Sequence, residues 1–366
     1  MIVPAQTPRS APPTARPRAG QLRSNVLAAI VALVLGGCGG TATPGSPTTA
    51  GSASPSAAVS AMPAWIAALG GRILFTKEAG SPTTFTVMTM APDGTDLRTI
   101  VAPSPTSIVH VVWGPGSRFT FDSDRAGQNQ VFSMDAAGND VRPLSSGPHG
   151  HGWPAVSRDG SSVVFDDWID QTDFGLLLTR ADGSPSNPRA LTTSADPAKG
   201  GDTQPAFSPD DKRVAFQRWV TPDPADPKAV TAAIFVVGID GKGLRQLTPY
   251  DMDAGLPRWS PDGSTILFTD HADTFNLPNT LSANLWTVRP DGSGLAQLTR
   301  ETGGNFAAEG SWAPDGSAIV FHSWFGSDSF TAIRVMKADG SEATPVLESP
   351  FNQGGAGEMP DWSPSR

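Results

Sequence analysis

A pattern of alternating apolar and polar residues recurs along the chain, and its clearest copy begins at Trp259. There the turn residues Ser260–Gly263 separate Trp259 from Thr265–Phe268, in which β-favouring side chains alternate. Ser-Pro-Asp-Gly favours a type I turn, because Pro261 presets φ and Gly263 supplies a left-handed residue for the next strand. This stretch therefore predicts two antiparallel strands joined by a tight turn.

A second pattern follows about twenty residues later. Leu285–Val288 reads as a strand, Asp291-Gly292 as a turn, and Leu295–Thr299 as another strand. Together the two patterns predict a four-stranded antiparallel meander.

Both patterns repeat six times, at the roughly 40–50-residue spacing of a propeller blade. The first lies near residues 113, 156, 207, 259, 312 and 362, and the second near 93, 138, 182, 240, 291 and 339. The first unit, Arg72–Thr76, has no strand pattern before it, whereas the chain ends on an isolated copy at Asp361–Pro364. We therefore predict an all-β fold over residues 66–366, a six-bladed β-propeller closed by the C-terminal strand pairing into the first blade.

The repeat resembles a known family. Ser-Pro-Asp-Gly followed by Ile-x-Phe, and later Asp-Gly followed by Leu-Thr, is similar to the WD40-like repeat of TolB-type propellers, with Phe121–Asp135 as the closest single match. The resemblance covers every blade and implies the propeller fold. It is to this class and not to TolB itself, whose propeller follows an additional α/β domain; here we expect only a short linker.

Composition supports many short strands and excludes one class of partner. The chain contains 39 glycines, 35 prolines and ten tryptophans, and five of the tryptophans (113, 259, 286, 312 and 362) fall at repeat positions, where we expect them to pack between blades. The formal charge is −9, and it becomes −13 without the first 37 residues, which contain four arginines and no acidic residue. Such a chain would be repelled by nucleic acid, so we expect no nucleic-acid partner.

The N-terminal region predicts export and lipid attachment. Residues 1–37 combine arginines with the apolar run Val26–Leu35, which is too short to span a bilayer and is typical of a signal peptide. Leu35–Cys38 resembles a bacterial lipobox, so we expect Cys38, the only cysteine, to be lipidated and to anchor the protein to a membrane outside the cytoplasm. An incidental thiol is the alternative. Residues 38–65, rich in Gly, Ser, Thr and Pro, predict a flexible linker.

The loop lengths predict one variable face. Turns between strands one and two and between strands three and four are short, whereas the connections at the other end are long and irregular. Recognition residues usually lie on such loops of a rigid scaffold. The variable loops are Ser145–Pro154, Thr192–Pro205, Gln217–Thr231, Thr269–Ala283, Thr299–Gly310 and Leu347–Pro360.

Six polar residues occur about once per blade, just before the predicted innermost strands, so we expect them to meet at the channel mouth on the variable face. Such a ring could hold Ca²⁺ through oxygen ligands or bind a basic segment of a partner; solvated loop charges are the simpler alternative. The predicted ligand-binding residues are His110, His151, Asp202, Asp253, Glu309 and Glu358.

The histidines allow a sharper hypothesis. His149, His151, His271 and His322 all fall on the variable face, and three convergent histidines could bind a transition metal, although scattered loop histidines are the more ordinary reading. Acyl-transfer chemistry has no support, since the Gly-x-Ser-x-Gly motif is absent. Sialidase chemistry is disfavoured as well, because Tyr250, the one tyrosine, would have to be the nucleophile.

Two functions from different classes remain. The first is a monomeric, lipid-anchored and non-enzymatic binding module for a protein, peptide or glycan on the variable face. The second is a metal-assisted polysaccharide lyase or hydrolase acting at the channel mouth. Proximity of His151, His271 and His322 would favour the second.

Overall fold

The structure, a computed structural model, describes residues 62–80, 83–168, 173–182, 188–193, 200–220, 231–271, 282–324, 330–350 and 358–363. The chain divides into two compact units, residues 1–59 and 60–366, and every described residue belongs to the second. The signal segment 1–37, Cys38 and most of the 38–65 linker thus lie outside the described residues. So do residues 194–199, 221–230, 272–281 and 351–357 of the variable loops. In the described part, no helix is both long and apolar enough to cross a membrane.

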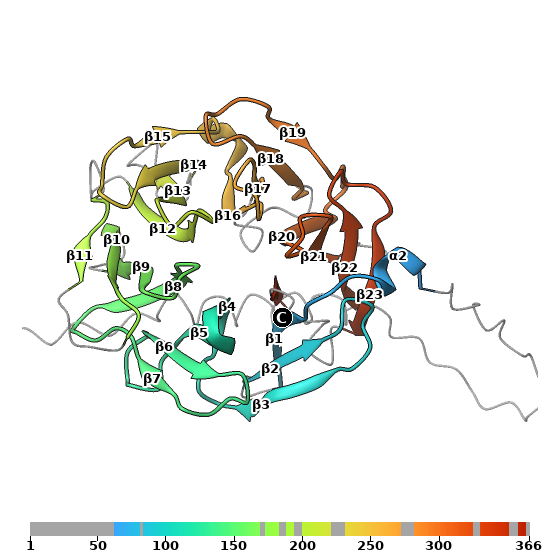
Figure 1. Ribbon diagram of the computed structural model, residues 1–366, viewed down its shortest axis with the longest axis horizontal. Coiled ribbons are helices and arrows are strands. Elements are labelled where there is room, and N and C mark those ends of the chain that lie inside the picture. The colour runs from blue at the N-terminus through green and yellow to red at the C-terminus, as the bar shows by residue number, and fades with distance from the viewer. Residues whose placement is uncertain are drawn as a thin grey trace, which may run out of the picture. The chain divides into compact units, whose positions relative to one another are not determined.

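Six antiparallel blades form a ring around a central axis (Figure 1). From the axis outward, blades A, B and C contain β24 (Glu358–Trp362), β1 (Ile73–Ala79), β2 (Thr84–Met90) and β3 (Arg98–Ser104); β4 (Val109–Gly114), β5 (Arg118–Ser123), β6 (Gln130–Asp135) and β7 (Arg142–Pro143); and β8 (Gly150–Val156), β9 (Ser162–Trp168), β10 (Asp173–Arg180) and β11 (Arg189–Ala190). Blades D, E and F contain β12 (Gly200–Phe207), β13 (Arg213–Val220), β14 (Thr231–Gly238) and β15 (Arg245–Gln246); β16 (Gly255–Trp259), β17 (Ile266–Thr269), β18 (Leu285–Val288) and β19 (Ala296–Gln297); and β20 (Phe306–Trp312), β21 (Ala318–Trp324), β22 (Phe330–Lys337) and β23 (Thr344–Pro350). The predicted six-bladed fold is confirmed.

The C-terminal strand closes the ring, as predicted. In blade A, β24 pairs with β1, so that Trp362 lies opposite Ile73 and Asp361 opposite Leu74. Ser363 extends the pairing, because its N–H donates to the carbonyl of Arg72 at 2.8 Å and its Oγ accepts the Arg72 N–H at 2.8 Å. The innermost strand of the first blade therefore comes from the opposite end of the chain.

The repeated turn has the predicted geometry. In blade E the N–H of Gly263 donates to the carbonyl of Ser260 at 2.8 Å, and Gly263 has φ of 71°. Asp262 accepts the Ser260 hydroxyl at 2.6 Å and the backbone N–H of Ser264 at 3.0 Å. Asp211, which replaces the turn glycine in blade D, also adopts positive φ, at 56°. The sequence motif thus builds the same turn even where its glycine is lost.

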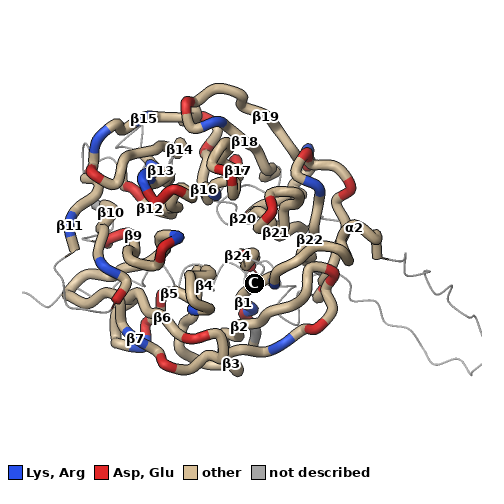
Figure 2. Tube along the Cα trace, viewed as in Figure 1, with Lys and Arg blue, Asp and Glu red and all other residues tan. Residues whose placement is uncertain are grey.

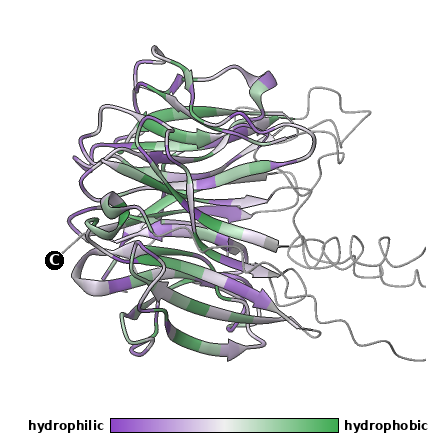
Figure 3. Ribbon diagram, turned by 90° about the vertical axis from the view of Figure 1, so that its right-hand side faces the viewer, coloured by the Kyte–Doolittle hydropathy of each residue, from purple (hydrophilic) through white to green (hydrophobic). Residues whose placement is uncertain are grey.

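The core lies between neighbouring blades, where the apolar sides of adjacent sheets meet. Trp259 contributes to the core shared by blades D and E and donates its indole N–H to the carbonyl of Ala206 at 3.2 Å. Trp312 bonds in the same way to Arg258 of blade E at 3.3 Å, which confirms the predicted packing between blades. Figure 3 shows apolar residues concentrated along the strands, with polar residues toward their ends.

Three short helical segments complete the described fold: α2 (Ala64–Ala67), η1 (Pro115–Ser117) and η2 (Tyr250–Met252). Ile66 of α2 is fully buried against Ile73 and Val320, at the junction of the first and last blades. One pairing is not anticipated by the repeat: β10 and β12 meet in parallel, with residue 173 opposite residue 200, so blades C and D share a continuous sheet.

Candidate functional site

Every innermost strand contains a β-bulge, where two of its residues interrupt the register with the second strand of the blade. In each bulge one non-glycine residue adopts positive φ, a conformation that costs about 1–3 kcal/mol and that tends to occur at functional sites. These six inner bulge residues are His110, Trp153, Gln204, Leu256, Glu309 and Met359, with φ between 49° and 60°. In four of them proline is the next residue, which removes one backbone donor from the strand.

The bulges are held by side chains of neighbouring residues in the ring. Gln204 of blade D accepts the N–H of Leu256 of blade E at 2.7 Å. Glu309 of blade F accepts the N–H of Met359 of blade A at 2.7 Å. The N–H of Glu309 itself donates to the hydroxyl of Thr269, in blade E, at 3.2 Å. Each blade therefore fixes the inner strand of the next, and the ring becomes one rigid polar scaffold.

At the junction of blades B and C, a histidine, a carboxylate and a tryptophan form a compact cluster. His110 Nδ1 lies 2.7 Å from Asp122 Oδ1, and the His110 ring stacks on Trp153 with centroids 3.6 Å apart. Asp122 also accepts the Trp153 N–H at 3.3 Å and the Asn129 amide at 2.7 Å. Asp122 is 1% exposed, whereas the His110 side chain is 11% exposed. The histidine therefore presents the accessible edge of the cluster.

Blade F carries the corresponding histidine–carboxylate pair. His322 Nδ1 lies 3.4 Å from Glu309 Oε2, both side chains are buried, and His322 Nε2 has no hydrogen-bond partner among the described residues. Burial raises the pKa of Glu309, but the hydrogen bond and charge of His322, with the N–H of Met359, outweigh it and leave this pKa below its ordinary value. The charge of His110 acts in the same direction, so the two pairs interact across blade A.

Asp166 of blade C is a carboxyl group with a strongly raised pKa. It is fully buried, and burial raises its pKa to about 7, an effect that the charge of Asp122 reinforces and the hydroxyl of Thr203 opposes. Thr203 belongs to blade D and donates that hydroxyl to Asp166. A carboxyl group that titrates near neutral pH is typical of functional sites, although structural networks also produce one.

The structure places the six predicted residues on or beside the innermost strands, although not all at equivalent positions. Five lie inside these strands and not before them, because the strands extend past the bulge to an earlier start; only Asp253 precedes its strand. His110 and Glu309 are inner bulge residues. Figure 2 shows charged residues on the inner strands β12 and β20 as well as on the outer turns.

The other predicted residues already have partners. Asp202 is fully buried and forms a two-point ion pair with Arg218, with N–O distances of 2.6 and 2.8 Å. His151 lies 2.9 Å from Gln130 Oε1 and 3.3 Å from Asp167 Oδ1, which His149 also approaches at 3.1 Å.

Asp253 ends η2 in a left-handed conformation, and its N–H donates to the carbonyl of Tyr250 at 3.0 Å. Glu358 begins β24 opposite Thr76 of β1. Both residues make side-chain or backbone interactions, so neither stands as a free carboxylate at the axis.

The histidines do not assemble as the metal hypothesis requires. Among the described residues, which include His151, His271 and His322, no group of three or more His, Cys, Asp or Glu side chains is placed to hold a metal ion. His151 is engaged in blade C and His322 in blade F.

Two residues central to the site, Asp122 and Asp166, are absent from the sequence-based selection. Both directly follow the phenylalanine of the repeat, Phe121 and Phe165, and this regular offset is a signal that could have identified them.

No protein-family profile matches the chain. An uncharacterized protein of Agrobacterium fabrum is 23% identical over 208 residues, which cover 56% of this chain and 65% of that protein. Dipeptidyl-peptidase 5 of Trichophyton equinum is 28% identical over 177 residues, 44% of this chain. Because the match spans only 23% of the peptidase, the chain corresponds to about a quarter of that enzyme.

Solved structures share the fold. TolB from Acinetobacter baumannii superposes with a TM-score of 0.61 at 18% identity, covering 81% of this chain and 67% of TolB. A chain of the nidogen/laminin complex gives 0.59 at 12% identity, covering 81% of this chain and all of that one. An oligogalacturonate lyase in complex with manganese gives 0.51 at 15% identity, covering 77% and 75%. The chain therefore has a TolB-like six-bladed propeller fold. At sequence identities this low, the likeness supports a shared fold and not a shared function.

Proposed function

We propose that this propeller is a non-enzymatic binding module that holds a segment of a protein partner against the inner bulge residues at the mouth of the central channel. The observation that carries the proposal is the interlocked ring itself. Its strained backbone positions are fixed by hydrogen bonds from neighbouring blades, as with Gln204 and Leu256. A surface that is rigid before binding loses little conformational entropy when its partner docks.

The chemistry of the ring favours a segment with basic or amide groups. Glu309 lies on the inner strand β20 and is oriented by His322, and Asp122 lies on β5, the second strand of blade B, and is oriented by His110. The whole chain is acidic, with a formal charge of −9, so the long-range field favours a basic partner. The nidogen/laminin complex shows that a propeller of this shape can take part in a protein complex. The predicted signal segment and Cys38 support an extracytoplasmic, membrane-anchored location for this module.

Site-specific photocrosslinking tests the proposal. A photoreactive residue at position 110, in the full-length protein in its native membranes, is expected to give discrete protein adducts that weaken as salt is raised. The same residue at position 97, on an exposed turn of blade A, is the matched control. Adducts that are equal from both positions, or absent from position 110, would contradict docking at the ring.

The alternative is a metal-assisted polysaccharide lyase or hydrolase. The likeness to the manganese-bound oligogalacturonate lyase and the unpartnered Nε2 of His322 favour it, whereas the lack of a metal-binding group among the described residues opposes it. Incubation with oligogalacturonate and Mn²⁺ separates the two functions. Turnover that disappears in His322→Gln would establish the enzyme and remove the binding proposal.

A further inference from the structure

Two blades carry an arginine clamp on the face opposite the variable loops. We define the clamp as two arginines that share one aspartate of the turn between strands three and four. In blade A, Arg72 and Arg98 both lie 2.7 Å from Asp96 Oδ2. Hydrogen bonds from Arg98 and Arg72 lower the pKa of Asp96. The aspartate adopts φ of 51°, which turns its side chain back between the two guanidinium groups.

Blade B repeats the same arrangement. Arg118 and Arg142 lie 2.9 and 2.7 Å from Asp140 Oδ2, and Asp140 has φ of 49°. In both clamps the first arginine has a second partner on the third strand, namely Thr89 Oγ1 in blade A and Ser133 Oγ in blade B, each at 3.1 Å. The clamp thus satisfies its inner arginine with one carboxylate and one hydroxyl.

Blade D has both arginines but neither partner. The strand registers make Arg245 equivalent to Arg142, since Arg245 lies opposite Val236 as Arg142 lies opposite Ser133. Arg213 begins the second strand, as Arg118 does. Glycine 243 stands where the aspartate would be, with the same left-handed backbone at φ of 69°, and Val236 replaces the hydroxyl residue. The clamp of blade D is therefore empty.

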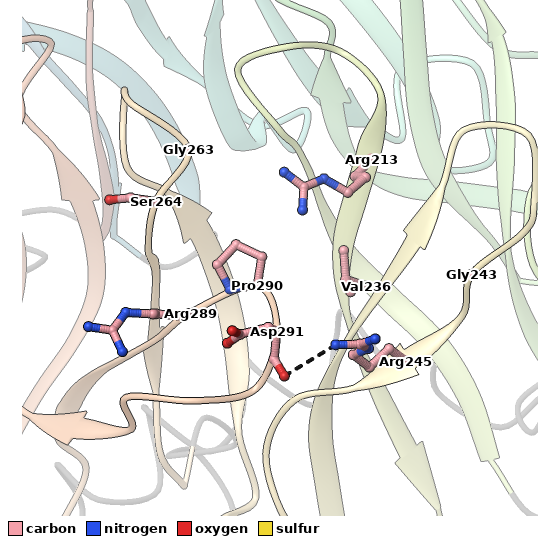
Figure 4. A pocket seen from close by; sticks show the side chains of 9 residues that line it. All are labelled: Arg213, Val236, Gly243, Arg245, Gly263, Ser264, Arg289, Pro290 and Asp291. Atoms are coloured by element: carbon pink, nitrogen blue, oxygen red, sulfur yellow. Dashed lines mark hydrogen bonds between the residues drawn. The ribbon is translucent and has the colours of Figure 1, made fainter.

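A pocket of about 480 Å³ opens at this position, between blades D and E. Figure 4 shows the guanidinium groups of Arg213, Arg245 and Arg289 around it, the last supplied by blade E. Arg213 is held in place, because its guanidinium lies 4.8 Å from the centre of the Trp259 ring. A Cβ added at Gly243 would meet no heavy atom within 4 Å, so there is room for a side chain to begin where the aspartate is missing.

The positive charge in this pocket is only partly balanced. None of the ion pairs formed among the described residues involves Arg213, Arg245 or Arg289. Arg245 bonds to a neutral carbonyl, that of Asp291, at 3.3 Å, and Arg289 to the hydroxyl of Ser293 at 3.5 Å.

Two carboxylates lie nearby, and each is already used by its own turn. Asp291 lines the pocket between Arg289 and Arg245 (Figure 4). Its main partner is Ser293, whose hydrogen bonds lower its pKa and whose N–H it accepts at 2.9 Å, while the charge of Arg289 lowers that pKa less. Asp210 is close enough for the charge of Arg213 to contribute to its lowered pKa, yet its main partner is the hydroxyl of Ser208. Asp291 is thus the one carboxylate that lines the pocket with the three guanidinium groups, and among the described residues it forms no ion pair with any of them.

We propose that the empty clamp of blade D binds carboxylate groups from an acidic segment of a partner protein, in place of the aspartate that blades A and B supply internally. The planar fork of arginine matches carboxylate geometry, and the two filled clamps show how the pair arranges around one such group. The third arginine, Arg289, accommodates a second carboxylate of the same segment. This site lies on the turn face and is independent of the inner bulge residues.

Binding of a dye-labelled hexaglutamate peptide to the full propeller, followed by fluorescence anisotropy at low ionic strength, tests this site. The peptide is expected to bind the natural sequence, while neutral hexaglutamine does not. Gly243→Asp fills the clamp internally and is expected to weaken hexaglutamate binding at least tenfold. That variant should fold, because aspartate adopts the same backbone conformation at Asp96 and Asp140. Arg289→Gln on the pocket rim is expected to weaken binding as well.

Arg142→Gln, in the filled clamp of blade B, is the matched control and should leave the affinity unchanged. Equal affinity for the natural sequence and Gly243→Asp would overturn the proposal. So would binding of inorganic phosphate without any binding of hexaglutamate, which would indicate a site for small anions. If acetate or citrate, compared at the same concentration of carboxylate groups, displaced the labelled peptide as well as unlabelled hexaglutamate does, the pocket would be a site for small organic acids and the proposal would be wrong.

Discussion

At the scale of single residues, one position of the repeat contacts the following blade at four of the six junctions. This position directly follows the phenylalanine of the second strand. The six residues are Thr76, Asp122, Asp166, Gln217, Thr269 and His322. Where the residue is a carboxylate, as in blades B and C, the ring gains acceptors for backbone or hydroxyl groups of the following blade.

Asp166 makes the stability of the propeller depend on pH. Its pKa is raised from 3.8 to about 7, so between these values the folded chain binds more protons than the unfolded one. Stability therefore falls as the pH rises from about 4 to about 7, and the loss persists above that range. The loss amounts to about 4 kcal/mol at most, at 1.36 kcal/mol per pKa unit.

Asp166→Asn is expected to remove this slope. Thermal unfolding should show the variant more stable than the natural sequence at about pH 8 and close to it at about pH 5. Asp339→Asn is the control, because the pKa of this exposed turn residue is lowered by the hydroxyl of Ser341 and should not affect that range. An unchanged slope in Asp166→Asn would show that Asp166 is ionised in the fold throughout.

The sequence identified some of these residues and missed others for a physical reason. His110 and Glu309 follow from their places just upstream of the predicted innermost strands, and both are inner bulge residues. Asp122 and Asp166 are not predicted, because the alternation of a strand shows only on which face of the sheet a side chain lies. It does not show which residue of the neighbouring blade packs against that face. The partners of the two aspartates, Trp153 and Thr203, belong to the following blade and lie over thirty residues away.

At the scale of elements, the repeated turns interact across blades. Arg158 replaces the turn proline in blade C, and Asp211 replaces the turn glycine in blade D. The two departures meet, since Asp211 Oδ1 accepts the backbone N–H of Arg158 at 2.6 Å and Oδ2 accepts that of Asp159 at 3.1 Å. Proline at position 158 would have no N–H to donate. From sequence each replacement is a separate loss of turn preference, whereas the structure shows one interaction between them.

A double-mutant cycle measures this interaction. Arg158→Pro and Asp211→Gly each restore the common turn residue, but the first removes the N–H of residue 158 and the second removes the carboxylate that accepts it. We expect a coupling free energy of unfolding of about 1–2 kcal/mol from denaturant titration of the two single variants and the double variant. Arg158→Ala keeps the N–H and should show almost no coupling to Asp211→Gly. Strict additivity of the proline and glycine variants would mean that the contact contributes nothing.

The positions of strands and turns follow from the repeat, but the bulges do not. Alternation of side chains predicts each strand, and Ser-Pro-Asp-Gly predicts its turn, because both are local properties of the chain. The amino-acid sequence around Leu256 does not favour a bulge with positive φ, because leucine rarely adopts that conformation. The bulge persists because Gln204 of the preceding blade accepts the N–H of Leu256, a contact that only the closed ring provides.

At the scale of the whole molecule, closure combines the two ends of the propeller into one blade. Trp362 of β24 is 5% exposed and packs with Ile66, Ile73 and Val335, so it contacts the N-terminal helix, the first strand of the chain and the last blade together. Its indole N–H donates to the carbonyl of Gly70 at 2.9 Å. The phase of the repeat was sufficient to predict this pairing, since a ring leaves no exposed strand edge.

Trp362→Ala is therefore expected to destabilise all six blades and not only blade A. Loss of a large buried aromatic side chain costs about 3–5 kcal/mol, and here the cavity would lie where the ring is joined by noncovalent contacts alone. Denaturant unfolding monitored by far-UV circular dichroism should show one cooperative transition at a lower midpoint. The reason is that an opened ring exposes the free edge of β1 and the apolar faces that meet between the first and last blades. Leu97→Ala, at a side chain that is 47% exposed, is the control and should change stability by less than about 0.5 kcal/mol. If Trp362→Ala instead lost only a minor part of the signal early, while the rest unfolded at the original midpoint, the blades would be stable without closure and the ring would not be the cooperative unit.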